Sequence, residues 1–293
     1  MDARQLEYFV TIVDEGGFHR AAGRLHVAQP SLSQAVRALE RDVGVPLFHR
    51  LGRRAVLTEA GRAMLEPARQ VLRDLETTRA VVDSVKGLRT GRVQLAALPS
   101  QSVEPLTTMI ERFHATDPGV LVSVLPAITA PEAADMVRGG SAELGLIGAA
   151  EDFALPGLSA HLVERQRFVV VTGPDGPWRA GRVVRRVELA GQRIITSQRG
   201  NRMRHVIDEA LAEGVDLRIA VETAHREAVL PLVLRGVGIA VLTEGWAEFA
   251  RASGAVVLPL EPAAELRISL IHRPAPLAPA AQRFLEVARA ERS

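Results

Sequence analysis

The chain has 293 residues, of which 47% are hydrophobic and 24% are charged, and it contains no cysteine. These proportions are typical of a folded globular protein, and at about 100–200 residues per domain the length predicts two or three domains. The missing cysteines exclude disulfides, thiolate metal ligands and cysteine redox chemistry. No segment approaches the roughly 18 apolar residues of a membrane span, and Met1-Asp2-Ala3-Arg4-Gln5 does not open like a signal peptide. We therefore expect a cytoplasmic protein.

The net charge of +2 is unevenly distributed along the chain. Residues 1–90 carry 14 Arg and Lys against 11 Asp and Glu, whereas residues 91–293 carry 22 against 23. Between Arg20 and Arg62, eight arginines stand against three acidic residues. Such a cluster fits either an ordinary solvated face or an electrostatic footprint for phosphates. Charge alone does not distinguish these two interpretations, so the pattern of residues has to decide between them.

The amino-terminal part of the chain predicts three short helices. Apolar residues recur at helical spacing in residues 4–14, in residues 18–25 after a glycine pair, and in residues 30–43. Pro30 stands near the first position of the third helix, where a missing N–H costs little. The outer face of that helix is polar and consists of Pro30, Ser33, Gln34, Arg37 and Arg41. Two short helices joined by a tight turn, the second with a donor-rich face, predict a helix-turn-helix.

The outer face of the third helix suits the major groove of DNA. Gln29 or Gln34 would pair with adenine, and Arg37 would reach guanine. Ser31 and Ser33 would reach either bases or phosphates. This face therefore favours DNA binding over a merely solvated surface.

Two short extended segments, residues 45–48 and 55–57, follow the third helix. They flank Arg50, Arg53 and Arg54, and each of these arginines taken alone fits ordinary surface. Beside a donor-rich helix, however, the arrangement predicts a β-wing whose arginines contact the DNA backbone or the minor groove.

These residues resemble the amino-terminal signature of LysR-type transcriptional regulators. The matching positions, in chain order, are Phe9-Val10, Glu15-Gly16, Phe18, Arg20-Ala21-Ala22, Leu25, Gln29-Pro30-Ser31-Leu32-Ser33, Leu39-Glu40, Gly44, Leu47-Phe48, Arg50, Arg53, Leu57-Thr58 and Ala60-Gly61. The resemblance implies a winged helix-turn-helix whose DNA-binding residues are Arg20, Gln29, Pro30, Ser31, Ser33, Gln34, Arg37, Arg50, Arg53 and Arg54. Ala28 departs from the family because a capping Ser or Thr is common there, so the cap is expected to be missing or replaced. His19 stands where the family commonly has a small hydroxyl residue.

Residues 59–89 predict a long linker helix. Its narrow seam steps by three and four residues through Leu65, Ala68, Leu72, Leu75, Arg79, Val82 and Lys86. That spacing favours pairing with a second copy of the chain, although packing on the chain's own domain stays open as an alternative. Pro67 is expected to bend the helix near its start. The resemblance implies a homodimer through this helix, and a homotetramer built as a dimer of dimers.

After residue 90 the pattern changes to alternating strands and helices. The expected strands are residues 93–98, 120–125, 144–148, 168–172, 193–196, 217–222, 238–242 and 266–272. The expected helices are residues 103–114, 131–138, 202–213, 225–235, 244–252 and 279–291. This alternation is typical of α/β folds with parallel strands.

The resemblance gives the overall organisation. It implies a winged helix-turn-helix domain over residues 1–58, a linker helix over 59–89, and a two-lobed effector-binding domain over 90–293 shaped like a periplasmic binding protein. Lobe I would comprise residues 91–161 plus 267–293, and lobe II residues 162–266.

A ligand is expected beyond the carboxyl ends of the strands. Hydroxyl groups and free N–H groups at a helix start suit an anion, so a small anionic molecule such as a carboxylate is the predicted effector. The candidate effector-binding residues are Ser100, Gln101, Ser102, Thr129, Arg199, Asn201, Arg202, Thr223 and His225. Each serine or threonine also fits a plain helix cap, and Arg199 and Arg202 also fit ordinary surface.

The sequence shows no catalytic constellation, metal-ligand spacing or cofactor fingerprint. We therefore expect no enzymatic activity, no cofactor and no metal. The leading hypothesis is a LysR-type regulator that binds double-stranded promoter DNA and changes its oligomer geometry when an effector binds; RNA polymerase is a further candidate partner. The alternatives are a small-molecule-binding protein and an enzyme on the same α/β scaffold.

Overall fold

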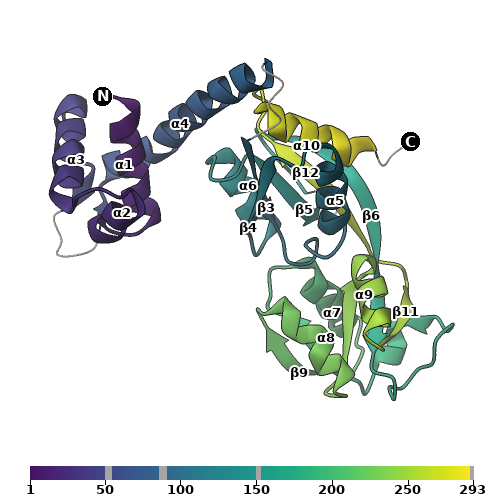
Figure 1. Cartoon of the computed structure of the whole chain (residues 1–293). Coiled ribbons are helices and arrows are strands. Elements are labelled where there is room, and N and C mark those ends of the chain that lie inside the picture. The colour runs from purple at the N-terminus through teal and green to yellow at the C-terminus, as the bar shows by residue number, and fades with distance from the viewer. Residues whose placement is uncertain (50–54, 86–90, 150–152, 291–293) are drawn as a thin grey trace. The chain divides into compact units, whose positions relative to one another are not determined.

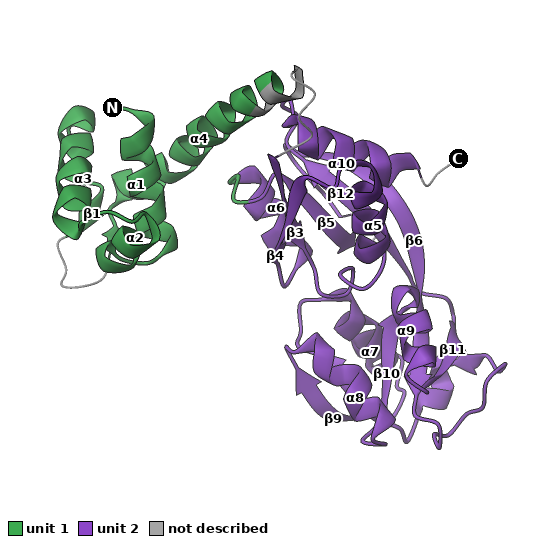
Figure 2. Cartoon of the chain, in the orientation of Figure 1, with its two compact units in different colours: residues 1–88, 139–141 green, residues 89–138, 142–293 purple. Residues whose placement is uncertain are grey.

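The computed structural model describes residues 1–49, 55–85, 91–149 and 153–290. The chain divides into two compact units, residues 1–88 with 139–141 and residues 89–138 with 142–293 (Figure 2). No helix within the described ranges combines the length and hydropathy needed to span a bilayer.

The smaller unit is a helix-turn-helix with a short β-hairpin and a long helix (Figure 1). Its elements are α1 (Ala3–Asp14), α2 (Phe18–Arg24), α3 (Gln29–Val43), β1 (Phe48–His49), β2 (Val56–Leu57) and α4 (Glu59–Val85). Helix α1 begins with a capping box, in which Asp2 and Gln5 each accept a hydrogen bond from the other's backbone N–H. Helix α3 is followed by the C-cap residue Gly44, whose φ of +79° lies in the left-handed region that favours glycine. The helices that the spacing predicted are therefore present.

The core of the smaller unit forms around Phe48, which belongs to the hairpin. Its ring centroid lies 5.5 Å from that of Phe9 in α1 and 5.4 Å from that of Phe18 in α2. Phe9 is fully buried, as are Leu32 and Leu39 on the inner face of α3. This packing fixes the orientation of α3 and leaves its opposite face exposed. As predicted, Ala28 provides no side-chain cap for α3.

The apolar seam of α4 is packed along its first part and exposed along its second part. Ala68 is buried in the core of the smaller unit, and Leu65 and Leu72 pack against that core. Here the alternative interpretation, packing on the chain's own domain, is correct. Further along, Leu75 and Val82 are exposed. Pro67 lies inside the helix as the sequence indicated, while Lys86 lies outside the described residues.

The larger unit is an α/β structure with two lobes (Figure 1). Its strands are β3 (Gly91–Ala97), β4 (Val120–Pro126), β5 (Leu144–Ala149), β6 (Ser159–Thr172), β7 (Val184–Arg185), β8 (Arg193–Ser197), β9 (Arg218–Thr223), β10 (Ile239–Thr243), β11 (Val256–Glu261) and β12 (Glu265–His272). Its α-helices are α5 (Leu106–Thr116), α6 (Ala130–Arg138), α7 (Arg202–Ala212), α8 (Val229–Leu234), α9 (Ala247–Ala252) and α10 (Pro279–Arg289). Three short 3₁₀ helices, η1 (Arg186–Leu189), η2 (Arg226–Ala228) and η3 (Glu244–Trp246), complete the described elements.

The main path of the sheet runs in the order β4-β3-β5-β12-β6-β10-β8-β9. Strands β3, β4 and β5 are parallel in one lobe, and β8, β9 and β10 are parallel in the other. The long strand β6 pairs with β12 in the first lobe and with β10 in the second, antiparallel to both. Strands β6 and β12 therefore connect the lobes, and the predicted boundaries near residues 161 and 266 fall inside these two strands.

Alternation along β3 supplies two separate cores in the first lobe. Val93 and Leu95 point to the side covered by α5 and α10, where the rings of Phe113 and Phe284 lie 5.1 Å apart. Ala96 points to the opposite side, toward α6. Each residue of the strand is therefore placed by its position in the pleat.

Three sequence predictions need correction. Helix α5 begins at Leu106 rather than at residue 103, because Pro105 disfavours helical backbone in the residue before it. Strand β6 extends nine residues before the predicted start at residue 168. Strands β7 and β11 were not predicted, and Pro259 within β11 explains why that segment does not read as a strand.

Candidate functional site

The first candidate site is the outer face of α3. Gln29, Pro30, Ser31, Gln34 and Arg37 are all exposed on this helix. Among the described residues, no carboxylate forms an ion pair with Arg37 or with Arg20 of α2. The face therefore presents amide, hydroxyl and guanidinium donors with uncompensated positive charge, which suits bases and phosphates of DNA.

A groove of about 1730 Å³ lies beside this face, within the smaller unit. Ser33, Gln34 and Arg37 line one side of it, and residues 44–46 together with β1 line another. The carboxylate of Glu40 also borders the groove, but its Oε1 accepts hydrogen bonds from the backbone N–H groups of Leu47 and Phe48. That acid holds the chain that leads into the hairpin. The three predicted wing arginines, Arg50, Arg53 and Arg54, lie outside the described residues.

The second candidate site is a cleft of about 700 Å³ within the larger unit, lined by residues of both lobes. Four of the predicted effector-binding residues line it: Ser100 and Thr129 from the first lobe, and Asn201 and Arg202 from the second. The Oγ1 atom of Thr129 also accepts a hydrogen bond from the backbone N–H of Glu132, so this residue both caps α6 and borders the cleft.

The other five predicted residues do not line this cleft. Gln101 is fully buried, and the hydroxyl of Ser102 donates to the backbone carbonyl of Leu98. Thr223 accepts a hydrogen bond from the backbone N–H of His225, whose own side chain is 80% exposed. Arg199 is exposed on the loop before α7. The serines also do not stand at the start of α5, because the helix begins later than predicted, so the proposed helix-terminus anion site is absent there.

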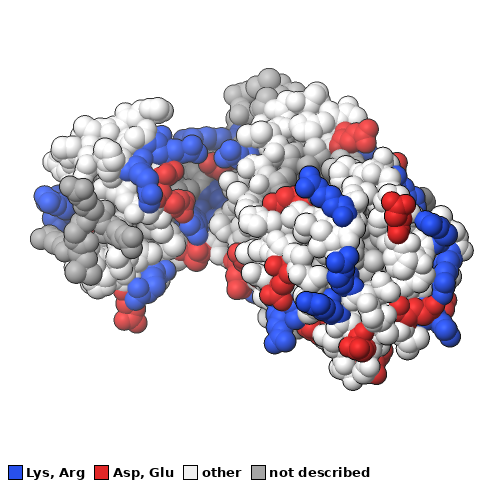
Figure 3. All heavy atoms as spheres, turned by 90° about the horizontal axis from the view of Figure 1, so that it is seen from below, with Lys and Arg blue, Asp and Glu red and all other residues white. Residues whose placement is uncertain are grey.

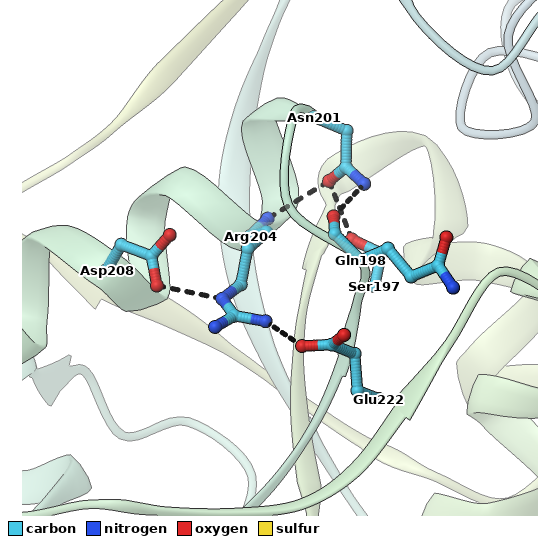
Figure 4. Close-up of polar contacts among 6 residues, drawn as sticks. All are labelled: Ser197, Gln198, Asn201, Arg204, Asp208 and Glu222. Carbon is cyan, nitrogen blue, oxygen red and sulfur yellow. Dashed lines mark hydrogen bonds and ion pairs between the residues drawn. The ribbon is translucent and has the colours of Figure 1, made fainter.

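A network of hydrogen bonds fixes the start of α7 at the cleft (Figure 4). The Oδ1 atom of Asn201 accepts from the backbone N–H of Arg204 at 3.1 Å and from the hydroxyl of Ser197 at 2.6 Å. The guanidinium of Arg204 donates from Nε to Asp208 at 2.8 Å and from Nη1 to Glu222. These carboxylates raise the pKa of Arg204, so it stays charged and ties α7 to β9.

Charged residues on the same side of the cleft are paired through Glu209. Its Oε1 lies 3.1 Å from Nη1 of Arg202 and 3.1 Å from Nε2 of His205. Arg186, which is buried, approaches the second oxygen of Glu209 at 3.5 Å. Arg202 therefore borders the cleft as a neutralised cation.

Several residues that line the cleft were not predicted from the sequence. Most are apolar, and two are polar and nearly fully buried, Arg226 and Thr243. The missed apolar and polar lining residues include Leu98, Phe153, Phe168, Met203, Asp208, Arg226, Thr243 and Leu266. Arg226 directly follows the predicted Thr223-Ala224-His225 loop, so the loop was identified but the residue that enters the cleft was not.

Outside the two candidate sites the charge distribution is mixed. Arginines and carboxylates are interspersed over the visible face of the larger unit, at the right in Figure 3. Within the described ranges, no group of three or more His, Asp or Glu side chains is placed to hold a metal ion.

Two protein-family models match the chain. The model described as "Bacterial regulatory helix-turn-helix protein, lysR family" matches residues 3–62, and the model described as "LysR substrate binding domain" matches residues 86–293. The first match covers the three helices and the hairpin, and the second covers the two-lobed unit.

Relatives match over most of their length. The chain is 31% identical to the HTH-type transcriptional regulator ShiR of Corynebacterium glutamicum over 84% of this chain and 83% of that protein. It is 29% identical to the RuBisCO operon transcriptional regulator of Allochromatium vinosum, covering 82% and 78% of the two chains. It is 27% identical to the dual regulator OxyR of Escherichia coli, covering 100% and 95%.

Solved structures agree with the fold. Full-length CbnR in complex with its target DNA has a TM-score of 0.70 and 25% identity, with 99% of each chain covered. A full-length OxyR variant from Pseudomonas aeruginosa has a TM-score of 0.74 and 22% identity, covering 99% of this chain and 94% of that one.

Proposed function

Because this chain belongs to the LysR family of DNA-binding transcriptional regulators, we propose that a small anionic molecule in its inter-lobe cleft controls how it binds promoter DNA. Every relative named above is a transcriptional regulator, and the chain is a regulator with an effector-binding domain rather than an enzyme.

The observation that carries the DNA-binding part is the exposed donor face of α3. Gln29, Ser31, Ser33, Gln34 and Arg37 would lie in the major groove, with the amide and guanidinium groups on base edges. Arg20 and Pro30 would border the backbone, and Arg50, Arg53 and Arg54 would contact DNA from the wing. CbnR, a protein of the same fold, has been solved in complex with its target DNA, which supports DNA binding by this chain.

We propose self-association through the exposed part of α4. Val71, Leu75, Val81 and Val82 are exposed apolar residues of this helix, and a second copy of the chain would cover them. Two copies would present two α3 helices to a two-fold DNA site, and pairs of dimers would form a homotetramer. The divisions at residues 58/59 and 89/90, and the lobe boundaries given above, belong to the same proposal, as do a cytoplasmic location and RNA polymerase as a partner.

The signal would start with the cleft. A ligand that contacts Ser100 and Thr129 in one lobe and Asn201 in the other would favour the lobe arrangement in which all three contacts form. A ligand shifts such an equilibrium only by the difference between its affinities for the two states. The resulting change in lobe arrangement would alter the geometry of the oligomer, and thereby the spacing or bend that it imposes on DNA.

The test is binding of the purified full-length protein to a labelled DNA fragment from beside its own gene. We expect tighter binding to this fragment than to a scrambled fragment of equal length and composition. We also expect affinity to fall steeply with salt, because bound phosphates release counterions. Equal affinity for the two fragments would contradict sequence-specific recognition by α3.

A further inference from the structure

Arg226 is a buried cation at the wall of the inter-lobe cleft. It lies in η2, directly after the turn that follows β9, and only 9% of it is exposed. Its Nη1 donates to the sulfur of Met203 at 2.9 Å, which is a weak acceptor. Among the described residues, no carboxylate forms an ion pair with it. The remaining N–H donors of its guanidinium therefore have no negatively charged acceptor among these residues.

The other charged groups of the cleft are already compensated. Arg202 pairs with Glu209, and Asp208 accepts from Arg204 (Figure 4). Arg226 differs from Arg202 and Asp208 because it has no ion-pair partner among the described residues. Burial lowers its pKa to about 10, and no paired carboxylate counteracts that effect. At pH 7 it is still protonated, so the cleft holds a desolvated positive charge. Burial of an unpaired charge is costly unless a counter-charge arrives from elsewhere.

A second buried polar group faces the same cleft. Thr243 is the last residue of β10, is 4% exposed, and lines the cleft. Within the described part of the chain, its Oγ1 atom has no hydrogen-bond partner. Buried hydroxyl groups are normally hydrogen-bonded, so this one lacks the partner that such a group usually has.

The rest of the lining is largely apolar. Phe168 of β6 lies directly opposite Thr243 in the β6–β10 ladder, and Phe153, Met203 and Leu266 line the same cleft. A volume of about 700 Å³ is within the range that holds small-molecule ligands. One uncompensated positive charge beside an apolar wall matches a molecule with one negative charge and an apolar body.

We propose that Arg226 anchors the effector through a carboxylate, that Thr243 donates a hydrogen bond to the same molecule, and that the effector is a monocarboxylate with an apolar body. This inference rests on the proposed function, in which the cleft binds an effector. The planar guanidinium suits a bidentate carboxylate. A dianionic phosphate would leave one negative charge without a partner in this cleft.

The experiment measures thermal melting and calorimetric binding with the full-length protein. The probes are benzoate, phenylacetate and hexanoate, each beside its uncharged amide, together with acetate and phenyl phosphate. We expect at least one of the three acids to raise the Tm by several degrees at saturation while its amide does not. Acetate lacks the apolar body and phenyl phosphate carries the wrong charge, so both should bind more weakly than that acid.

Variants assign the effect to Arg226. Arg226→Met keeps the length of the side chain without its charge and should weaken binding of the acid by about ten- to a hundredfold. Arg226→Lys should give an intermediate loss, because the charge remains but the planar fork does not. Thr243→Val should weaken binding several-fold. The matched control Arg199→Gln, which removes an exposed arginine outside the cleft, should bind as the parent does.

The ligand-free Tm separates anchoring from a structural role. Arg226→Met should melt at or above the parent temperature, since it removes a desolvated charge and no ion pair. A lower ligand-free Tm, together with unchanged affinity for the acid, would show a structural role and overturn the inference. The inference would also be wrong if no acid stabilised the parent more than its amide.

DNA binding is measured on the same samples. Sequence-preferring, salt-sensitive binding by the parent and by Arg226→Met would leave the regulator proposal intact even if Arg226 failed as an anchor. If the parent itself showed no such DNA binding, the result would instead count against the proposed function.

Discussion

The two candidate sites are assembled from the chain in different ways. The α3 face takes its polar side chains from residues 29–37 of one helix, whereas the cleft takes its lining from segments between residues 98 and 266. The helix face has uncompensated charge on its exposed surface. The cleft has uncompensated charge where water is largely excluded, at Arg226.

This difference determines what each site tolerates. A side chain on the exposed face of α3 can change without disturbing the core, because Leu32, Val36 and Leu39 on the opposite face hold the helix in place. A residue at the cleft is also part of the packing or hydrogen bonding of its lobe, as Asn201 shows. A substitution on the exposed face of α3 should therefore change DNA binding without changing stability. A substitution such as Asn201→Ala at the cleft should change both ligand binding and stability.

The largest expected effect tests whether the two units have independent cores. Phe9→Ala removes a fully buried ring and should destabilise the smaller unit by about 3–5 kcal/mol. DNA binding should be lost while binding of a ligand in the cleft persists. Phe284→Ala is the mirror control, because it empties the core between α5 and α10 in the larger unit. If calorimetry showed one common unfolding transition that both substitutions shift, the two units would not have independent cores.

The next effect concerns base recognition. Arg37→Ala should cost about 1–3 kcal/mol of DNA-binding free energy and relax the preference at one base position, with no change in Tm. Binding assays on a set of single-base operator variants would measure this. Arg24→Ala, which removes an exposed arginine of α2, is the control. A loss that is uniform over all sequences would mean that Arg37 contacts phosphate instead of a base edge.

A smaller effect is expected at the cleft. Asn201→Ala removes the cap of α7 and the acceptor for Ser197, and should cost about 1 kcal/mol of stability. Unlike Arg37→Ala, it should also weaken ligand binding. Asn201→Asp keeps the capping oxygen and should restore most of the stability. Urea unfolding with parallel calorimetry measures both quantities, and an unchanged urea midpoint in the alanine variant would show that the cap is unimportant.

The smallest effect is a pH dependence at a histidine pair that lines neither site. The Nε2 atoms of His161 and His272 lie 3.0 Å apart, and Nδ1 of His272 lies 2.6 Å from the carbonyl of Arg273. That carbonyl requires Nδ1 of His272 to donate, so Nε2 of His161 donates to Nε2 of His272. Burial, with the nearby charges of His272 and Arg289, lowers the pKa of His161.

As the pH falls through about 6.5, the unfolded chain therefore binds a proton before the folded protein does. Stability should decrease across this window and level off once folded His161 is protonated. His161→Gln should flatten the curve of Tm against pH, relative to His19→Gln, which changes an exposed histidine. A parent curve that rises toward low pH would contradict the assignment.

Much of the fold was predictable from local pattern. The three short helices and the strands β3, β4 and β5 follow from apolar spacing, turn residues and strand alternation, whereas the missing cap at Ala28 follows from the comparison with the family signature. Strand β11 was not predictable, because Pro259 interrupts its pattern and its pairing with β6 and β7 makes it a strand. Apolar spacing alone places the start of α5 at residue 103, because it does not register that Pro105 disfavours helical backbone in the residue before it.

A helix with an exposed polar face, and the family signature around it, can be identified from the sequence alone. Helical periodicity is a property of neighbouring residues, so the face is present in the sequence before the chain folds. Which residues line the cleft depends on the folded chain: Arg226 lines it, whereas the side chain of His225 is exposed and does not. Contacts between distant segments depend on strand order and packing, and these decide which polar groups lose their contact with water.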